Sequence, residues 1–82
     1  MNYQVEFKPR ALKDLECLPD RERRRIMAKV EALKNNLAGD VKKLTNFTPE
    51  YRLRVGDYRV LFEIEAPKLV IYRVLHRKDA YG

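Results

Sequence analysis

The sequence has 82 residues, of which 45% are hydrophobic and 37% are charged. A chain of this length fits one domain, residues 1–82, and its apolar fraction excludes wholesale disorder. The formal net charge of +6 indicates a polyanionic partner. That partner is nucleic acid, an anionic membrane or an acidic protein, and charge alone does not choose among the three.

A single cysteine, Cys17, excludes a disulfide framework and is typical of a reducing compartment. Because it lies inside a helical pattern, we expect a small buried apolar residue rather than a reactive thiol. The N-terminus has no basic stretch followed by an apolar one, and no apolar run approaches the roughly 20 residues that a membrane-spanning helix needs. The sequence therefore predicts a cytoplasmic protein without a membrane partner.

The N-terminal half predicts one strand and two helices. Residues 2–8 alternate between polar and apolar side chains, which is typical of a half-buried strand. Leucines spaced by three predict a helix over 9–18, and Pro19 ends it. A second amphipathic helix is expected from an N-cap at Asp20 to a stop near Gly39, and its apolar stripe is Ile26, Val30, Leu33 and Leu37. Turn-forming residues then predict an irregular connection over 40–50.

The C-terminal third changes to a strand periodicity. Alternating patterns predict strands over 51–55 and 58–65, joined by a two-residue turn at 56–57. A nearly continuous apolar run over 69–75 predicts a strand buried on both faces. The fold class is therefore α+β with the order β-α-α-β-β-β. We expect a helical hairpin packed on one face of a twisted, mainly antiparallel four-stranded sheet, with the first strand at one edge.

Arginines occupy the strand positions that should point away from the helices. If Leu53, Val55 and their apolar partners face the helices, then Arg52, Arg54 and Arg59 gather on the opposite face. Like charges this close are unfavourable without an anion between them, and guanidinium groups bind phosphate in a bidentate way. The face is therefore either a phosphate-binding surface or a solvated strand face that prevents aggregation.

The C-terminal tail adds residues that favour the phosphate-binding interpretation. His76 is the only histidine and lies where the last strand ends, followed by Arg77 and Lys78. Imidazole titrates near neutrality, and Tyr81 can stack on a base or donate its hydroxyl. A lone histidine is more often structural, so its neighbours carry this argument. The run Arg23–Arg25 is interpreted as the exposed side of an amphipathic helix.

Known metal and cofactor motifs are missing from the sequence. One cysteine, one histidine and scattered carboxylates do not form a metal-ligand pattern, and there is no Gly-rich phosphate loop or nucleophile elbow. An enzyme with this sequence is expected to work without a metal or an organic cofactor.

Two C-terminal segments resemble the RelE/ParE superfamily of toxins from type II toxin–antitoxin modules. The segment 51–63, YRLRVGDYRVLFE, resembles the family's strand pair, and 74–81, VLHRKDAY, resembles its C-terminal motif. The first strand and the helical hairpin also fit, so the resemblance spans nearly the whole chain. It implies a cognate antitoxin that wraps the toxin, and a toxin–antitoxin hetero-oligomer that binds operator DNA.

In the RelE branch, the resemblance implies a ribosome-dependent endoribonuclease. The toxin enters the ribosomal A site and cuts mRNA by attack of a ribose 2′-hydroxyl on the neighbouring phosphate. Arg59 matches an arginine that steadies this phosphate, and Arg77 lies in a segment that holds a further catalytic arginine. Tyr81 matches a tyrosine that stacks on or orients the substrate. Arg52 and Arg54 replace lysines of some relatives, and with Lys78 they would bind RNA phosphates.

The identity of the general base is open at this point. Arginine is not readily deprotonated, so Arg52 and Arg54 cannot replace a lysine as the base. The proton would pass to His76, which we favour, to Tyr81, or to a carboxylate such as Glu63 or Glu50.

Two other functions remain as alternatives. One is a ParE-like inhibitor of DNA gyrase that shares the fold but lacks nuclease activity. The other is a non-catalytic module that binds RNA or an antitoxin.

Overall fold

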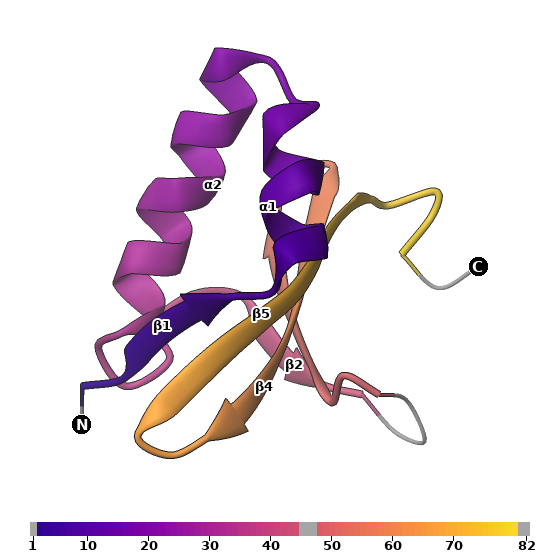
Figure 1. The fold of residues 1–82 in the computed structure, drawn as a ribbon. Helices are drawn as coiled ribbons and strands as arrows, with labels where there is room; N and C mark the ends of the chain where they lie inside the picture. Colours follow the sequence, from indigo (N-terminus) through magenta and orange to yellow (C-terminus); the bar gives the residue numbers. More distant parts are fainter. Residues whose placement is uncertain (1, 45–47, 81–82) are drawn as a thin grey trace.

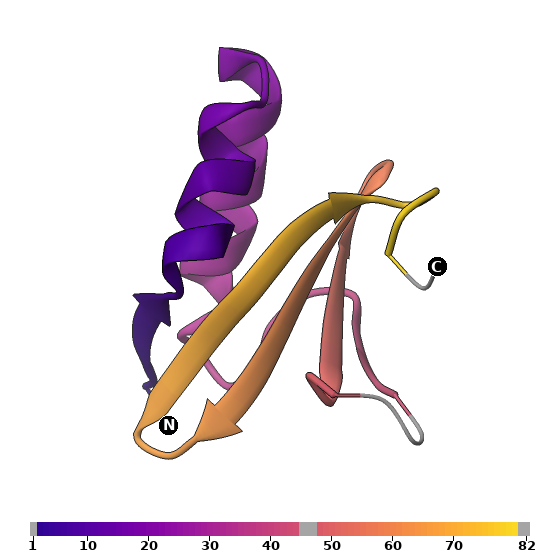
Figure 2. The ribbon, with the colours of Figure 1, turned by 45° about the vertical axis from the view of Figure 1, so that its right-hand side comes forward.

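The computed structural model describes residues 2–44 and 48–80. Five strands form one sheet in the order β1-β5-β4-β3-β2, and two helices pack on one of its faces (Figure 1, Figure 2). The elements are β1 (Gln4–Phe7), α1 (Pro9–Glu16), α2 (Asp20–Leu33), β2 (Val41–Lys43), β3 (Tyr51–Val55), β4 (Tyr58–Glu65) and β5 (Lys68–His76). The predicted α+β class, the helical hairpin and the edge position of β1 are confirmed.

The prediction of four strands is wrong by one. Val41–Lys43, which we expected to be irregular, forms β2 and pairs with β3 in antiparallel register. Three residues give too short an alternation to be recognised in the sequence, and pairing with β3 supplies the hydrogen bonds that make them a strand. β2 thereby places Asp40 next to β3, where the backbone N–H of Arg54 donates to the carbonyl oxygen of Asp40 at 3.0 Å.

The helix boundaries differ from the prediction at both ends of α2. Asp20 lies in the first turn rather than at the N-cap, which is Pro19. The helix ends at Leu33, and Asn36 and Leu37 adopt φ values of 55° and 58°. Leu37 still packs against the core, so the chain keeps the apolar contact of the predicted stripe while leaving the helix. Cys17, at the C-cap of α1, is exposed rather than buried.

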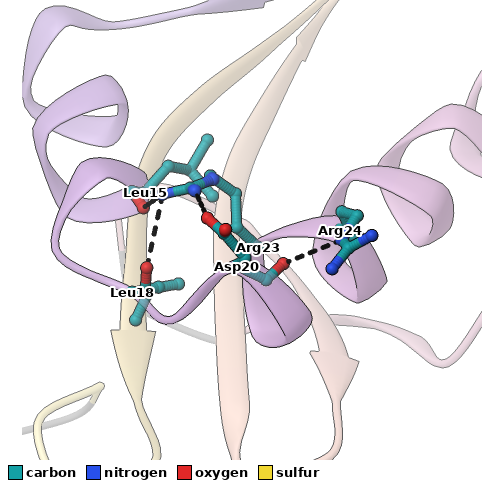
Figure 3. A network of polar contacts seen from close by, with 5 residues as sticks. All are labelled: Leu15, Leu18, Asp20, Arg23 and Arg24. Carbon is teal, nitrogen blue, oxygen red and sulfur yellow. Dashed lines mark hydrogen bonds and ion pairs between the residues drawn. The ribbon is translucent and has the colours of Figure 1, made fainter.

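Arg23 closes the short connection between the two helices (Figure 3). Its guanidinium donates to the carbonyl oxygens of Leu15 and Leu18, both at 3.3 Å, and forms an ion pair with Asp20. The last carbonyl groups of a helix lack partners within that helix. Arg23 supplies donors to the end of α1, which the interpretation of residues 23–25 as a solvated helix face did not predict.

The main core lies between the helices and the sheet. Leu53, Val55, Val60 and Phe62 are all buried there, which confirms the predicted inward face of the β3–β4 hairpin. The opposite face has a second, smaller buried set that lies outside this cluster and consists of Leu61, Val70 and Ala80. The C-terminal segment runs along this opposite face (Figure 2). β5 is therefore buried on both faces, as predicted.

An ion pair joins α1 to β5 where β1 ends. β1 pairs in parallel with β5 only from Lys68 to Ile71. Beyond that point, Asp14 of α1 accepts hydrogen bonds from the Val74 backbone N–H at 2.9 Å and from Arg73 Nε at 2.8 Å. The hydrogen bond that Arg73 donates to Asp14 raises the pKa of Arg73, burial opposes this effect, and the attraction between the two charges adds to it. The Asp14 carboxylate thus takes the place of a strand partner.

Candidate functional site

Arg54 and Arg59 lie directly opposite each other on the face away from the helices. They are register partners in the β3–β4 hairpin, and their neighbours Leu53, Val55 and Val60 point into the helix-side core. Opposed residues in an antiparallel pair have Cβ atoms about 5 Å apart. The Arg54 side chain is exposed, and Arg59 is half-buried. Two arginine side chains therefore leave the sheet from opposed positions on one open face, as the alternation predicted.

Arg77 extends this pair at the end of β5. Arg59 pairs with Leu75, so Arg77 lies diagonally from Arg59, and such diagonal neighbours are roughly 7–8 Å apart in a regular ladder. The Arg77 backbone N–H donates to the carbonyl oxygen of Asp57 at 2.7 Å, which continues the β4–β5 register by one position. We refer to Arg54, Arg59 and Arg77 as the arginine cluster. Lys78 follows Arg77 and is exposed.

Arg52 lies on the same face as the arginine cluster, but its guanidinium is bound to Asp40 and is less available to an anion. Its side chain is only 12% exposed and forms an ion pair with Asp40 at 3.3 Å. Its Nη1 also donates to the Asp40 carbonyl oxygen at 3.2 Å, and its Nε is buried without a partner among the described residues. The sequence placed Arg52 on the correct face, but it could not show that the missed strand β2 brings a carboxylate beside it.

His76 points to the other face of the sheet. It pairs with Tyr58, and the two rings contact edge-to-face with centroids 5.5 Å apart. Nδ1 of His76 accepts a hydrogen bond from the Lys78 backbone N–H at 3.2 Å. The structure does not bring His76 to the arginine cluster.

The predicted Tyr81 lies outside the described residues. Its neighbour Ala80 is only 3% exposed, and the C-terminal segment lies on the open side of the sheet, away from the helices (Figure 1, Figure 2). Up to Ala80, the chain therefore lies on the same side of the sheet as the arginine cluster.

Arg25 and Asp57 lie next to the arginine cluster and were not predicted as site residues. The Arg25 guanidinium packs against Gly56, where a Cβ atom would be 2.8 Å from Nη1. Gly56 has a φ of 57°, a conformation that favours glycine. Asp57 Oδ1 is 3.9 Å from Arg77 Nε. The sequence identified the turn but gave no sign of which side chains pack around it.

The described residues contain no group of three or more His, Cys, Asp or Glu side chains that could hold a metal ion. Within this part of the chain, no helix is long and apolar enough to cross a membrane. The site that the residues do form is the arginine cluster on an open sheet face, with Arg54 and Arg77 exposed and Arg59 half-buried. The planar donors of these side chains match the oxygens of a phosphodiester.

Comparison with known proteins assigns the chain to a family. Residues 5–81 match the family model described as the ParE toxin of the type II toxin–antitoxin system parDE. The chain is 36% identical to Toxin RelE3 of Methanocaldococcus jannaschii, over 95% of this chain and 94% of that protein.

Solved structures of toxin–antitoxin complexes have the same fold. A RelB–RelE complex from Methanococcus jannaschii matches with 37% identity and a TM-score of 0.76, over 92% of this chain and 93% of the other. The RelBE2 complex of Mycobacterium tuberculosis matches with 29% identity and a TM-score of 0.80, over 94% and 100%. The chain therefore belongs to the RelE/ParE superfamily of toxins from type II toxin–antitoxin modules.

Proposed function

We propose that this toxin is a ribosome-dependent endoribonuclease that cuts mRNA in the A site and so inhibits translation in the cytoplasm. The observation that carries the proposal is the cross-strand pair of Arg54 and Arg59, with Arg77 diagonal to it, on an open sheet face. Three guanidinium groups at this spacing match the charge that accumulates on a phosphodiester during cleavage.

The proposed reaction is a transesterification within the RNA chain. The ribose 2′-oxygen bonds to the adjacent phosphorus, and the bond from phosphorus to the 5′-oxygen breaks. The 2′-hydroxyl loses its proton to a base, and the 5′-oxygen gains one. The products are a 2′,3′-cyclic phosphate and a free 5′-hydroxyl. In this step the arginine cluster stabilises the added charge on the phosphorane.

The proton transfers need groups other than arginine. His76 faces away from the arginine cluster, and its Nδ1 accepts a hydrogen bond, so it is poorly placed to act as the base. Glu63 lies on the same face as Arg59, four residues further along β4, and its Oε1 accepts a hydrogen bond from the Glu50 backbone N–H at 2.6 Å. Tyr81 and Glu63 are therefore the candidates for the general base.

The protein's small size suits a reaction that the ribosome positions. Holding the 2′-hydroxyl in line with the phosphate supplies much of a rate enhancement, and the A site can provide it. The arginine cluster, with Lys78 beside it, then needs only to bind the phosphate that is presented. We expect weak cleavage of free RNA for this reason.

We also propose a cognate antitoxin as the protein's partner. The matching solved structures are complexes of RelE toxins with RelB antitoxins. The net charge of +6 suits an acidic partner that covers the arginine cluster and prevents RNA binding. The resulting hetero-oligomer would bind operator DNA.

A second candidate is inhibition of DNA gyrase without nuclease activity. It is supported by the match of residues 5–81 to the ParE toxin model. A basic sheet face without a working general base would favour this function, or a non-catalytic binding module, over the nuclease.

The deciding experiment uses ribosomes stalled with a defined codon in the A site. Purified toxin is added, and new mRNA 5′ ends are mapped by primer extension. We expect a cut within the A-site codon that Arg59→Ala abolishes. Arg10→Ala, which removes the same charge from the exposed start of α1, should leave the cut intact. Free RNA without ribosomes tests dependence on the ribosome, and EDTA in that reaction excludes cleavage by a metal-dependent contaminant.

Uncut mRNA on well-formed complexes would refute the nuclease. A gyrase supercoiling assay would then separate the two remaining functions. Inhibition would identify a ParE-like toxin, and its absence would leave the binding module.

A further inference from the structure

We propose that Asp57 is a positioning residue for the arginine cluster: it holds Arg77 beside Arg59 and, by its charge, weakens RNA binding. The inference rests on the proposed nuclease function. Asp57 is the second residue of the β3–β4 turn and has no place in the predicted chemistry. It is nevertheless the only acidic residue between Tyr51 and Phe62, a segment that holds three arginines.

Asp57 contacts Arg77 through both its backbone and its side chain. The last register pair of β4 and β5 is Tyr58 with His76, so Arg77 lies beyond the end of the sheet. Its backbone N–H donates to the Asp57 carbonyl oxygen at 2.7 Å, and its Nε is 3.9 Å from Asp57 Oδ1. Among the described residues, this is the only ion pair that Arg77 makes. Without the carboxylate, the backbone bond would remain, but the guanidinium would lose its orientation.

The turn that carries Asp57 is held in place from two sides. Arg59 Nη1 donates to the Gly56 carbonyl oxygen at 2.9 Å and to the Tyr58 carbonyl oxygen at 3.0 Å. On the helix side, the Arg25 guanidinium packs against Gly56. Contacts from β4 and from α2 thus fix the turn, and a fixed turn is what a positioning residue requires.

The Asp57 carboxylate has two opposing effects on the site. It attracts the Arg77 guanidinium, which orients a donor toward the phosphate next to Arg59. It also adds negative charge within a few ångströms of where a phosphate would bind, which repels RNA. Both side chains are largely exposed, 63% for Arg77 and 66% for Asp57, so each effect is modest. Neutralising Asp57 should therefore strengthen binding and weaken catalysis at the same time.

The test is Asp57→Asn, which keeps the size of the side chain and removes its charge. Binding is measured by the fluorescence anisotropy of a labelled single-stranded RNA oligonucleotide, and cleavage by single-turnover kinetics on stalled ribosomes with saturating toxin. We expect the Kd for RNA to fall about two- to fivefold. We expect the cleavage rate constant to fall about three- to fivefold, because Arg77 is no longer oriented.

Two matched variants define the comparison. Glu65→Gln makes the same charge change at the opposite, exposed end of β4 and should alter neither quantity by more than about twofold. Asp57→Glu retains a carboxylate and should keep the weaker RNA binding of the wild type while recovering part of the rate. A purely structural role for Asp57 would instead lower RNA binding, rate and thermal stability together.

Other results would refute either the positioning role of Asp57 or the proposed nuclease function. If the wild type cuts mRNA and Asp57→Asn raises both binding and rate, Asp57 only repels RNA and the positioning role is wrong. Unchanged binding and rate would also overturn it. If the wild type does not cut mRNA at all, the proposed function fails and takes this inference with it.

Discussion

Removing the Asp14 carboxylate should destabilise the toxin more than any exposed charge change. Asp14 is 16% exposed and forms a bidentate pair with Arg73, with Nε at 2.8 Å and Nη2 at 3.1 Å. It also accepts the Val74 backbone N–H at 2.9 Å. Asp14→Ala leaves that N–H and a half-buried guanidinium without their acceptor.

The expected cost follows from these contacts. An unsatisfied buried N–H costs about 1–3 kcal/mol, and loss of the hydrogen bonds to the charged Arg73 adds about 1–2 kcal/mol after allowing for its exposure. We therefore expect Asp14→Ala to lower the free energy of unfolding by about 2–5 kcal/mol. At about 4–8 °C per kcal/mol for a domain of this size, Tm falls by roughly 8–40 °C. Asp14→Asn keeps an acceptor for Val74, so it should cost about half as much.

The assay is urea and thermal unfolding followed by circular dichroism, with Glu16→Ala on the exposed side of the same helix as the control. A loss below about 0.5 kcal/mol, the range of ordinary surface substitutions, would refute the argument that Asp14 completes the β5 edge.

The raised pKa of Arg73 fixes how its ion pair with Asp14 contributes to folding stability at different pH values. Asp14 raises the pKa of Arg73 above its already strongly basic ordinary value. A raised folded-state pKa stabilises the protein fully below the unfolded-state pKa, and the gain is lost as pH rises through the folded-state value. The arginine contribution should therefore be constant through neutral and mildly alkaline pH. A decline there, absent from Asp14→Ala, would contradict it.

Three further predictions concern the site. Arg52→Ala should lower stability more than Arg54→Ala, since Arg52 is 12% exposed and bound to Asp40. Arg54→Ala should weaken RNA binding more than Arg52→Ala. Urea unfolding measures the first effect and fluorescence anisotropy the second. Gly56→Ala should cost about 1–2 kcal/mol from its positive φ, and more while Arg25 is present; equal costs in the wild type and in an Arg25→Ala background would disprove the steric contact. The slope of log K for RNA against log salt should become shallower by about 0.7 in Arg54→Ala, and an unchanged slope would remove Arg54 from the phosphate contacts.

Local patterns in the sequence determined much of the fold and part of the site. The alternation around Leu53 and Val60 fixed which side of the β3–β4 hairpin faces the helices, and therefore placed Arg54 and Arg59 together on the other side. The turn at Gly56 followed from residue type. These features depend on neighbours within a few positions, which is the range over which periodicity and turn propensity act.

Tertiary contacts decided the rest because they join residues that are distant in the chain. Asp14 and Arg73 are 59 positions apart, and neither residue's surroundings in the sequence mark it as a partner of the other. Arg52 is covered because the three-residue strand β2 brings Asp40 beside it, and a segment that short carries no readable period.

Closeness in the sequence also did not show that His76 belongs to the site. His76 follows Val74 with the spacing of one strand face, so the alternation itself places it on the helix side. Its closeness in sequence to Arg77 had suggested a shared site. The sequence alone thus determined the helix-facing pattern and the exposed arginines, which are encoded by local alternation. Only the tertiary structure decided which arginines stay free for an anion and which are neutralised, because that depends on the carboxylates that packing brings to them.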